Sequence, residues 1–151
     1  MPQSLVEEDD VSSNRTILVV DDQPDIRLMC RVNLALEGYQ VVEAVDGEEA
    51  KMCLHEHQPD LVLLDVMMPG IDGWEILTWM KGTPEFAGIP VVMLTARVQR
   101  EDELKGWSLG VSDYLPKPFN PSSLTQVVNR VIVSQDDPER RRRAIEKLTI
   151  I

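Results

Sequence analysis

The sequence predicts a doubly wound α/β domain organised on one parallel sheet. Apolar runs suited to strands alternate five times with amphipathic segments suited to helices along the 151-residue chain, which is typical of strands joined by crossover helices. The central run, residues 61–66, is apolar except for Asp65, as expected of a strand that is buried on both faces. Right-handed crossovers then place helices on both faces of the sheet.

Composition and charge exclude several classes of function. The chain carries 26 acidic and 15 basic residues, a net charge of −11, and an acidic surface repels phosphate backbones, so we expect no direct contact with nucleic acid. No apolar run approaches the roughly 20 residues of a membrane span, and no export signal is recognisable. We therefore expect a cytoplasmic protein without membrane contact. Cys30 and Cys53 lack metal or redox spacing and are predicted to be reduced and buried.

The first half of the chain contains two strand–helix pairs. The first strand covers residues 16–20, and its helix begins near Pro24 and stops at Gly38, since proline is favoured in a first helical turn and glycine after the last. The second strand covers residues 40–44. Asp46 is expected to cap the following helix, because a carboxylate can accept the unpaired N–H groups of a first turn.

The central strand leads into a turn and a third helix. Residues 61–66 are followed by the turn-forming pair Pro69 and Gly70, and apolar residues between Trp74 and Met80 predict the helix. The fourth strand is predicted over residues 89–96.

The last elements are a helix, a short strand and a longer helix. The fourth helix is weakly amphipathic over residues 100–109, and Gly110 closes it. The fifth strand covers residues 113–115. The fifth helix begins at Pro121 and continues through Ile132 with apolar residues at helical spacing.

One domain, residues 16–134, is flanked by two short segments. Residues 1–15 are polar and acidic without periodicity, and we expect a disordered tail there. Residues 135–151 begin with acidic residues and continue with an arginine run and spaced apolar residues, so a C-terminal helical tail or linker is predicted.

Polar side chains follow four of the five strands. The carboxyl ends of parallel strands meet at one edge of a sheet, where ligands bind. The predicted edge holds three carboxylates, a hydroxyl and an ammonium: Asp21, Asp22, Asp65, Thr95 and Lys117. Crowded carboxylates repel one another unless they share a cation. Oxygen ligands with retained waters suit Mg²⁺, or Mn²⁺ in its place.

Asp65 is the predicted nucleophile of this site. An aspartate can attack phosphorus and form an acyl phosphate. A divalent ion, an ammonium and a hydroxyl stabilise the charge that develops on the phosphoryl oxygens in such a reaction. Mg²⁺, Lys117 and Thr95 would supply these three groups.

Five short motifs carry a family resemblance. They are ILVVDD (17–22), LLDVMMPG (63–70), DG (72–73), LTA (94–96) and DYLPKPF (113–119). Over about residues 15–134 the chain resembles the receiver domain of two-component response regulators, in the chemotaxis-regulator-like superfamily. The resemblance implies a flavodoxin-like fold, in which a five-stranded parallel sheet of order 2-1-3-4-5 lies between two layers made by five helices, a three-layer sandwich.

The resemblance also implies roles at the metal site. Asp65 would take a phosphoryl group from a histidine kinase or a histidine phosphotransfer protein. Asp22, Asp65 and the backbone carbonyl of Met67 would bind Mg²⁺ directly, and Asp21 would act largely through water. Met67 and Arg97 would flank the approach of attacking water and so tune the lifetime of the phosphate.

The remaining family positions form a switch. Thr95 and Lys117 would hold phosphoryl oxygens, and Tyr114 resembles the switch aromatic that turns inward when Thr95 moves towards the phosphate. The bond between Lys117 and Pro118 is cis in the family, which an X-Pro bond adopts at about 0.5–1 kcal/mol. The altered face, formed by the fourth helix, fifth strand and fifth helix, would bind an output protein or a second receiver.

Two other interpretations share parts of this site. A magnesium-dependent phosphatase of the haloacid dehalogenase type needs a second aspartate two residues after the nucleophile, where this chain has Met67, which cannot transfer a proton. A flavodoxin-like cofactor binder needs a loop rich in Ser, Thr and Gly, where this chain has DDQP at residues 21–24. We therefore expect a signalling domain that catalyses only its own phosphorylation and dephosphorylation, either alone or as the receiver fragment of a longer regulator.

Overall fold

The computed structural model describes residues 15–96 and 100–136. They form a five-stranded parallel sheet in the order β2-β1-β3-β4-β5, with five helices, which confirms the predicted architecture. The strands are β1 (Thr16–Val20), β2 (Gln40–Ala44), β3 (Leu61–Asp65), β4 (Val91–Thr95) and β5 (Asp113–Pro116). The helices are α2 (Pro24–Leu36), α3 (Gly47–His57), α4 (Gly73–Lys81), α5 (Arg100–Ser108) and α6 (Pro121–Asp136).

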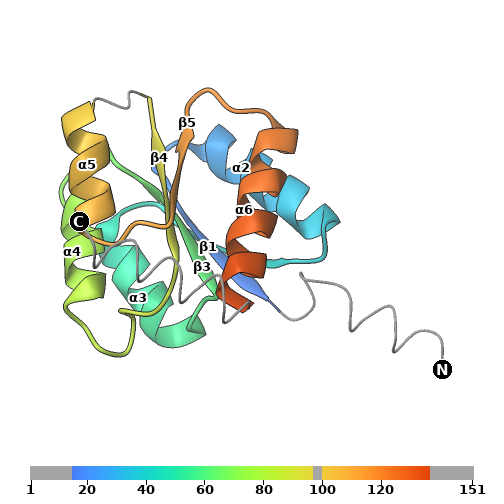
Figure 1. Ribbon diagram of the computed structural model, residues 1–151. Helices are drawn as coiled ribbons and strands as arrows, with labels where there is room; N and C mark the ends of the chain where they lie inside the picture. Colours follow the sequence, from blue (N-terminus) through green and yellow to red (C-terminus); the bar gives the residue numbers. More distant parts are fainter. Residues whose placement is uncertain (1–14, 97–99, 137–151) are drawn as a thin grey trace.

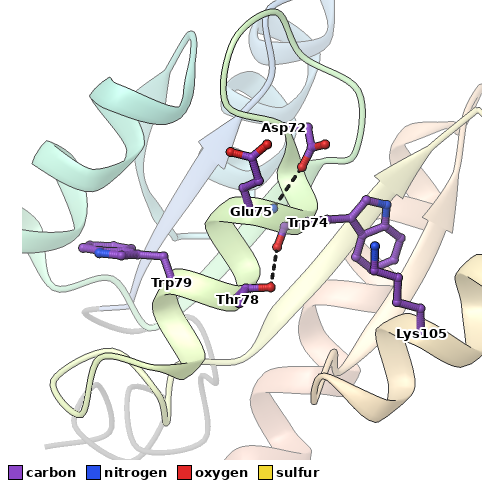
Figure 2. Close-up of a pocket in the computed structure, with 6 residues that line it drawn as sticks. All are labelled: Asp72, Trp74, Glu75, Thr78, Trp79 and Lys105. Carbon is purple, nitrogen blue, oxygen red and sulfur yellow. Dashed lines mark hydrogen bonds between the residues drawn. The ribbon is translucent and has the colours of Figure 1, made fainter.

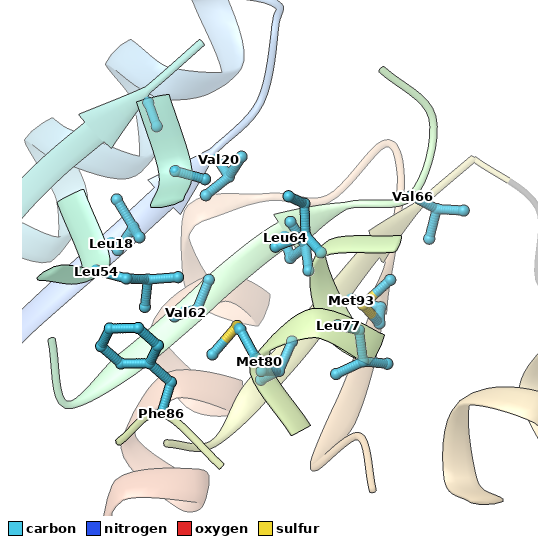
Figure 3. Close-up of a cluster of buried hydrophobic side chains, with 14 of the residues drawn as sticks. Leu18, Val20, Leu54, Val62, Leu64, Val66, Leu77, Met80, Phe86 and Met93 are labelled. Atoms are coloured by element: carbon cyan, nitrogen blue, oxygen red, sulfur yellow. The ribbon is translucent and has the colours of Figure 1, made fainter. Parts of the chain in front are cut away.

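Helices cover both faces of the sheet, so the fold has three layers. In Figure 1, α2 and α6 lie on one face, and α3, α4 and α5 lie on the other. Successive side chains of a strand point to opposite faces, and each face of the central strands is fully buried. Leu18 and Leu64 pack with α3 and α4 in the cluster of Figure 3. Ile17 and Leu63 pack with α2 and α6.

Carboxylates cap two of the helices. The side chain of Asp46 accepts a hydrogen bond of 2.9 Å from the backbone N–H of Glu49 at the start of α3, as predicted. Asp72 accepts an equivalent bond from Glu75 at the start of α4. Each cap satisfies an N–H group that has no partner inside its helix, and so fixes where the helix begins.

The fourth strand is shorter than the predicted 89–96. It covers only Val91–Thr95, because Pro90 has no N–H group to donate to a neighbouring strand. The carbonyl oxygen of Pro90 still accepts a bond of 3.0 Å from the N–H of Val62, which aligns β4 with β3. The last helix continues beyond Ile132 to Asp136.

The two cysteines occupy different environments. Both are free thiols, and Cys30 is fully buried as predicted. Cys53 is only half-buried, so the prediction that it would be buried was wrong. Cys53 lies on α3, partly buried against the hydrophobic cluster, and its sulfur is 3.8 Å from the carbonyl oxygen of Glu43 on β2.

The ends of the described chain lie close together. Arg15, just before β1, forms an ion pair of 2.6 Å with Asp136 at the end of α6. The tails were predicted over residues 1–15 and 135–151, and of these residues 1–14 and 137–151 lie outside the described part of the chain. Gln135 and Asp136 belong to α6 and not to a separate tail. Within the described part of the chain, none of the helices combines the length and apolar character that a membrane crossing requires.

Candidate functional site

The sheet brings the strand-ending polar residues to one edge. Asp21 directly follows β1, Asp65 is the last residue of β3, and Thr95 is the last residue of β4. The register of the parallel strands places these residues at similar heights along the sheet: Asp65 lies opposite Leu94, the residue before Thr95. The N–H of Lys117 donates 2.7 Å to the carbonyl oxygen of Thr95, which fixes the end of β5 at the same level.

Three carboxylates form a compact acidic cluster at this edge. Oxygen atoms of Asp21, Asp22 and Asp65 all lie within 4.8 Å of one another. Asp21 is fully buried, Asp65 is 4% exposed, and Asp22 is exposed. The cluster therefore has a buried floor and one side open to solvent, a geometry that admits a small cation with some of its water.

Lys117 places a positive charge next to the cluster. Its Nζ lies 2.7 Å from Asp21 Oδ2 and 3.5 Å from Asp65 Oδ2, and it donates a bond of 3.3 Å to the side-chain oxygen of Gln23. The ion pair with Asp21 lacks hydrogen-bond geometry, so Asp21 Oδ2 is a buried oxygen without a hydrogen-bond partner among the described residues. A buried carboxylate oxygen in this state fits a site completed by a cation and its water.

The environment of Asp65 raises its pKa to about 6, from an ordinary value of 3.8. Burial is the largest cause, and the negative charge of Asp21 adds to it. Lys117 and a hydrogen bond from the N–H of Met67 to Asp65 Oδ1, 3.2 Å long, oppose the rise. The Asp65 carboxylate is thus under repulsion that a bound cation would relieve.

A tight loop after β3 holds Asp65 in place. Gly73 opens α4, and its N–H donates a bond of 3.0 Å to the carbonyl oxygen of Val66. A Cβ at residue 73 would overlap the carbonyl oxygen of Asp65 and lie 2.9 Å from Val66 Cα, so only glycine allows this close approach. Met67 sits in the loop with its side chain 76% exposed.

The predicted switch residues lie on neighbouring strands but in different surroundings. Thr95 is buried, 7% exposed, at the end of β4. Tyr114 on β5 reaches under α5, where its hydroxyl donates a bond of 3.1 Å to the carbonyl oxygen of Glu103. The peptide bond between Lys117 and Pro118 is cis. Arg97 lies outside the described residues.

Two residues of the site carry no recognisable signal in the sequence. Gln23 contacts Lys117 through its side chain, and its N–H donates 2.9 Å to Asp21 Oδ1. Arg27 donates a bond of 2.8 Å to the carbonyl oxygen of Asp21 and forms an ion pair of 3.4 Å with Glu43. Both hold the loop after β1, but polar residues near a helix start are common, and their spacing alone does not reveal these contacts.

A shallow pocket of about 420 Å³ lies elsewhere on the surface. It runs along α4 towards α5 and is lined by two indole rings, three polar groups and an ammonium: Trp74, Trp79, Asp72, Glu75, Thr78 and Lys105. Figure 2 shows Trp74, Glu75, Thr78 and Trp79 along α4, Asp72 just before it, and Lys105 reaching towards Trp74 from α5. None of the acidic cluster residues lines it, so it is separate from the site at the sheet edge.

Comparison with known proteins shows which family the chain resembles. Residues 17–129 match the response regulator receiver domain. The chain is 43% identical over 118 residues to the phosphate regulon transcriptional regulatory protein PhoB of Escherichia coli, which covers 78% of this chain and 52% of PhoB. It is 38% identical over 120 residues to the DNA-binding dual master transcriptional regulator RpaA of Synechocystis, covering 80% of this chain and 50% of RpaA. The chain spans about half the length of the curated relatives that it matches.

Solved structures give the same result. The chemotaxis response regulator CheY4 of Vibrio cholerae superposes with a TM-score of 0.75 at 33% identity, covering 79% of this chain and 99% of CheY4. The N-terminal domain of a response regulator receiver protein from Methanoculleus marisnigri is 40% identical with a TM-score of 0.65, covering 77% of this chain and 94% of that domain.

Proposed function

Since the chain belongs to the receiver domain family of two-component response regulators, we propose that it accepts a phosphoryl group on Asp65 and thereby changes an interaction surface. The position of Asp65 carries this proposal. Its carboxylate is grouped with those of Asp21 and Asp22 within 4.8 Å, and the Lys117 ammonium lies 3.5 Å away. A nucleophile, a cation site and a fixed positive charge are the parts that phosphoryl transfer requires.

Asp65 is the nucleophile in this proposal, and the donor is a phosphohistidine of a histidine kinase or of a histidine phosphotransfer protein. An Asp65 carboxylate oxygen forms a bond to phosphorus while the bond from phosphorus to the imidazole nitrogen breaks, and the electron pair of that bond stays on the imidazole. The attacking carboxylate must be ionised. With a pKa of about 6, it is mostly ionised at neutral pH.

The acidic cluster fits Mg²⁺, or Mn²⁺ in its place, because all its donors are oxygen atoms. Asp22, Asp65 and the backbone carbonyl of Met67 would hold the ion. Asp21 would contribute through a water molecule, and such a water can donate to the buried Oδ2 that has no hydrogen-bond partner among the described residues. The bound ion would reduce the repulsion among the three carboxylates. It would also reduce their repulsion of the negatively charged phosphoryl oxygens.

Lys117 and Thr95 are assigned to the phosphoryl oxygens. Lys117 now pairs most closely with Asp21, at 2.7 Å, and its flexible side chain needs only a short movement to face a group on Asp65. Thr95 is the last residue of β4, the strand next to β3. Its hydroxyl would therefore be close enough to move towards a phosphoryl group on Asp65.

The signal would leave the site through Thr95 and Tyr114. Movement of Thr95 towards the phosphate would let Tyr114 turn inward, and this would shift the population of states of the face formed by α5, β5 and α6. The partner on this face would be an output protein or a second receiver. A net charge of −11 argues against nucleic acid as a direct partner of this domain.

The domain would act either alone or as the receiver part of a longer regulator. RpaA is named a DNA-binding regulator and PhoB a transcriptional regulator, and the chain spans about half of each. Residues 16–134 would be the receiver domain, with residues 1–15 and 135–151 as flanking segments. It would act in the cytoplasm through protein–protein contact, either alone or as the receiver part of a longer chain.

The residues around Asp65 favour a long-lived phosphoaspartate and not its rapid hydrolysis. A phosphatase with an aspartate nucleophile needs an acid–base group beside it, and Met67 occupies the place two residues after Asp65 with an exposed side chain that cannot transfer a proton. We assign Met67 and Arg97 to tuning the access of water. The chain would then catalyse only its own phosphorylation and dephosphorylation.

Incubation with acetyl phosphate or phosphoramidate and Mg²⁺, followed by mass spectrometry of the intact protein, tests the proposal. We expect one added phosphoryl group in the wild type, and none in Asp65→Asn, because an amide is not a nucleophile at phosphorus. Glu48→Gln is the matched control, since it removes an exposed carboxylate on α3 and should leave the adduct unchanged. No adduct with either donor, or an undiminished adduct in Asp65→Asn, would refute the proposal.

A further inference from the structure

The ring of Tyr114 occupies a notch in α5 that exists because residue 106 is glycine. Tyr114 extends from β5 beneath the helix, and its hydroxyl donates a bond of 3.1 Å to the carbonyl oxygen of Glu103, one turn earlier than Gly106. A Cβ on residue 106 would overlap the Tyr114 hydroxyl and lie 2.8 Å from its Cζ. Any other side chain at residue 106 therefore excludes the ring from this position.

The backbone gives no other reason for glycine at this place. Gly106 lies inside a helix and is not among the residues with a positive φ, so alanine would adopt the same conformation and would favour the helix more strongly. Among residues 103–108, only Gly106 is buried. The notch is therefore at the most buried position of this part of α5.

Aromatic side chains form the walls of the notch. The ring of Trp107 meets Tyr114 edge-on, with 5.5 Å between the ring centroids and an interplanar angle of 81°. Trp74 of α4 lies on another side, with Cη2 3.3 Å from the place of a Cβ on residue 106. Figure 2 shows Lys105 against the Trp74 ring, and its Nζ lies 5.0 Å from the ring centroid. When the Tyr114 ring is in the notch, it thus links β5 to α5.

We propose that Gly106 is a positioning residue for the switch, and that its notch holds Tyr114 in the ring position of the unphosphorylated state. This inference rests on the proposed function, in which phosphorylation of Asp65 moves Tyr114 towards Thr95. When the ring leaves, α5 loses the hydrogen bond at Glu103 and the contact with Trp107, so the surface of α5 changes.

A methyl group in the notch would penalise only the state that has the ring there. The population of the displaced state then rises, and by linkage every ligand that prefers this state binds more tightly. Gly106→Ala should therefore resemble partial activation. The atoms that must move are the far end of one side chain, so the fold itself should persist.

The test compares Gly106→Ala with the wild type in two measurements. Near-ultraviolet circular dichroism, which reports the surroundings of Trp74, Trp107 and Tyr114, should change while the far-ultraviolet spectrum stays the same. Titration with beryllofluoride in the presence of Mg²⁺ is followed by tryptophan fluorescence. Gly106→Ala should reach half-saturation at a beryllofluoride concentration that is lower than that of the wild type by a factor of about three or more. Gly88→Ala is the matched control, because a Cβ added at residue 88 would meet no atom within 4 Å beyond its chain neighbours, and this variant should match the wild type in both measurements.

The Tyr114→Ala background separates positioning from helix propensity. Without the ring there is no overlap, so adding Gly106→Ala should leave half-saturation within about twofold of Tyr114→Ala alone. An equal shift in both backgrounds would overturn the proposal, as would a Gly106→Ala protein that behaves like Gly88→Ala. If Gly106→Ala alone fails to fold, the double variant must fold, and its failure would also overturn the proposal.

The two proposals fail in different ways. If beryllofluoride does not bind the wild type, the proposed phosphoacceptor function is refuted, and near-ultraviolet spectra still decide the role of the notch. In that case the spectrum of Gly106→Ala must shift towards that of Tyr114→Ala, in which the ring is missing. A spectrum identical to the wild type would refute the notch.

Discussion

At the scale of single residues, the charge of Asp65 is set by what surrounds it. A carboxylate in water has a pKa near 4, and this one is raised to about 6 by burial and by the neighbouring Asp21, against the opposing effect of Lys117. The native protein therefore pays a free-energy cost for the ionised nucleophile. Because a bound cation removes this repulsion, its removal adds to the free energy of cation binding at Asp65.

Asp65→Asn should stabilise the metal-free protein. The raised pKa means that the native state binds more protons than the unfolded state between about pH 4 and 6, so wild-type stability falls as pH rises through that window. An amide has no charge to bury, and the variant should exceed the wild type by about 2 kcal/mol at pH 7 and by less at pH 5. Urea unfolding with a chelator at both pH values measures the difference. A variant less stable than the wild type at pH 7 would contradict this account of Asp65.

At the scale of elements, the connection between β3 and α4 determines where the nucleophile lies. The helix cap at Asp72 fixes the first turn of α4, and Gly73 lets that turn approach the end of β3 more closely than any other residue would allow. The N–H of Met67 then reaches Asp65 Oδ1 at 3.2 Å. The motif LLDVMMPG with DG is thus a structural unit as well as a chemical one.

Gly73→Ala should lower the free energy of unfolding by about 2–3 kcal/mol, because the new Cβ meets backbone atoms that cannot rotate away. Chemical denaturation measures the change. Gly82→Ala is the control at the other end of the same helix, where the nearest atom to a Cβ is the Thr78 carbonyl oxygen at 3.4 Å and φ is −86°. It should change stability by no more than about 0.5 kcal/mol, and equal losses in the two variants would rule out the close approach as the cause.

At the scale of the whole molecule, the parallel sheet makes one site from residues that are far apart in the chain. All strands point the same way, so the residues that end or directly follow β1, β3, β4 and β5 meet at one edge. Hydrophobic clusters on both faces hold the strands in register. The resulting edge has three carboxylates within 4.8 Å, which adds repulsion to the native state.

Mg²⁺ should therefore stabilise the folded chain as a whole. A ligand that binds only the native state raises the free energy of unfolding by mass action, and ~10 mM MgCl₂ should add about 1.4 kcal/mol for a dissociation constant of roughly 1 mM. Thermal unfolding with and without Mg²⁺ measures this. Asp22→Asn should lose most of the increment, whereas Glu48→Gln should keep it, because its carboxylate is on α3 and outside the cluster. A stabilisation that is equal in all three proteins would show general salt binding instead.

Much of the fold was predictable because its signals are local. Strand and helix types follow from periodicity and from turn residues, and the Asp46 cap was predicted and is present. The order of the strands followed from the family motifs. The fourth strand was predicted too long, since the apolar run includes Pro90, which has no N–H group to donate to a neighbouring strand. Cys53 was predicted buried but is half-buried, because burial depends on how the helix is rotated against the sheet.

The sequence by itself determined the chemical inventory of this protein: an apolar strand ending in Asp65, an acid pair, a hydroxyl and an ammonium in the order of a known family. Only the tertiary structure decided how these groups act on one another. The pairing of Lys117 with Asp21, its contact with Gln23 across 94 positions and the raised pKa of Asp65 depend on distances and burial. The notch at Gly106 also appears only when β5 and α5 are packed together. Periodicity is a property of neighbouring residues, whereas electrostatic energy and steric fit depend on every atom nearby in space.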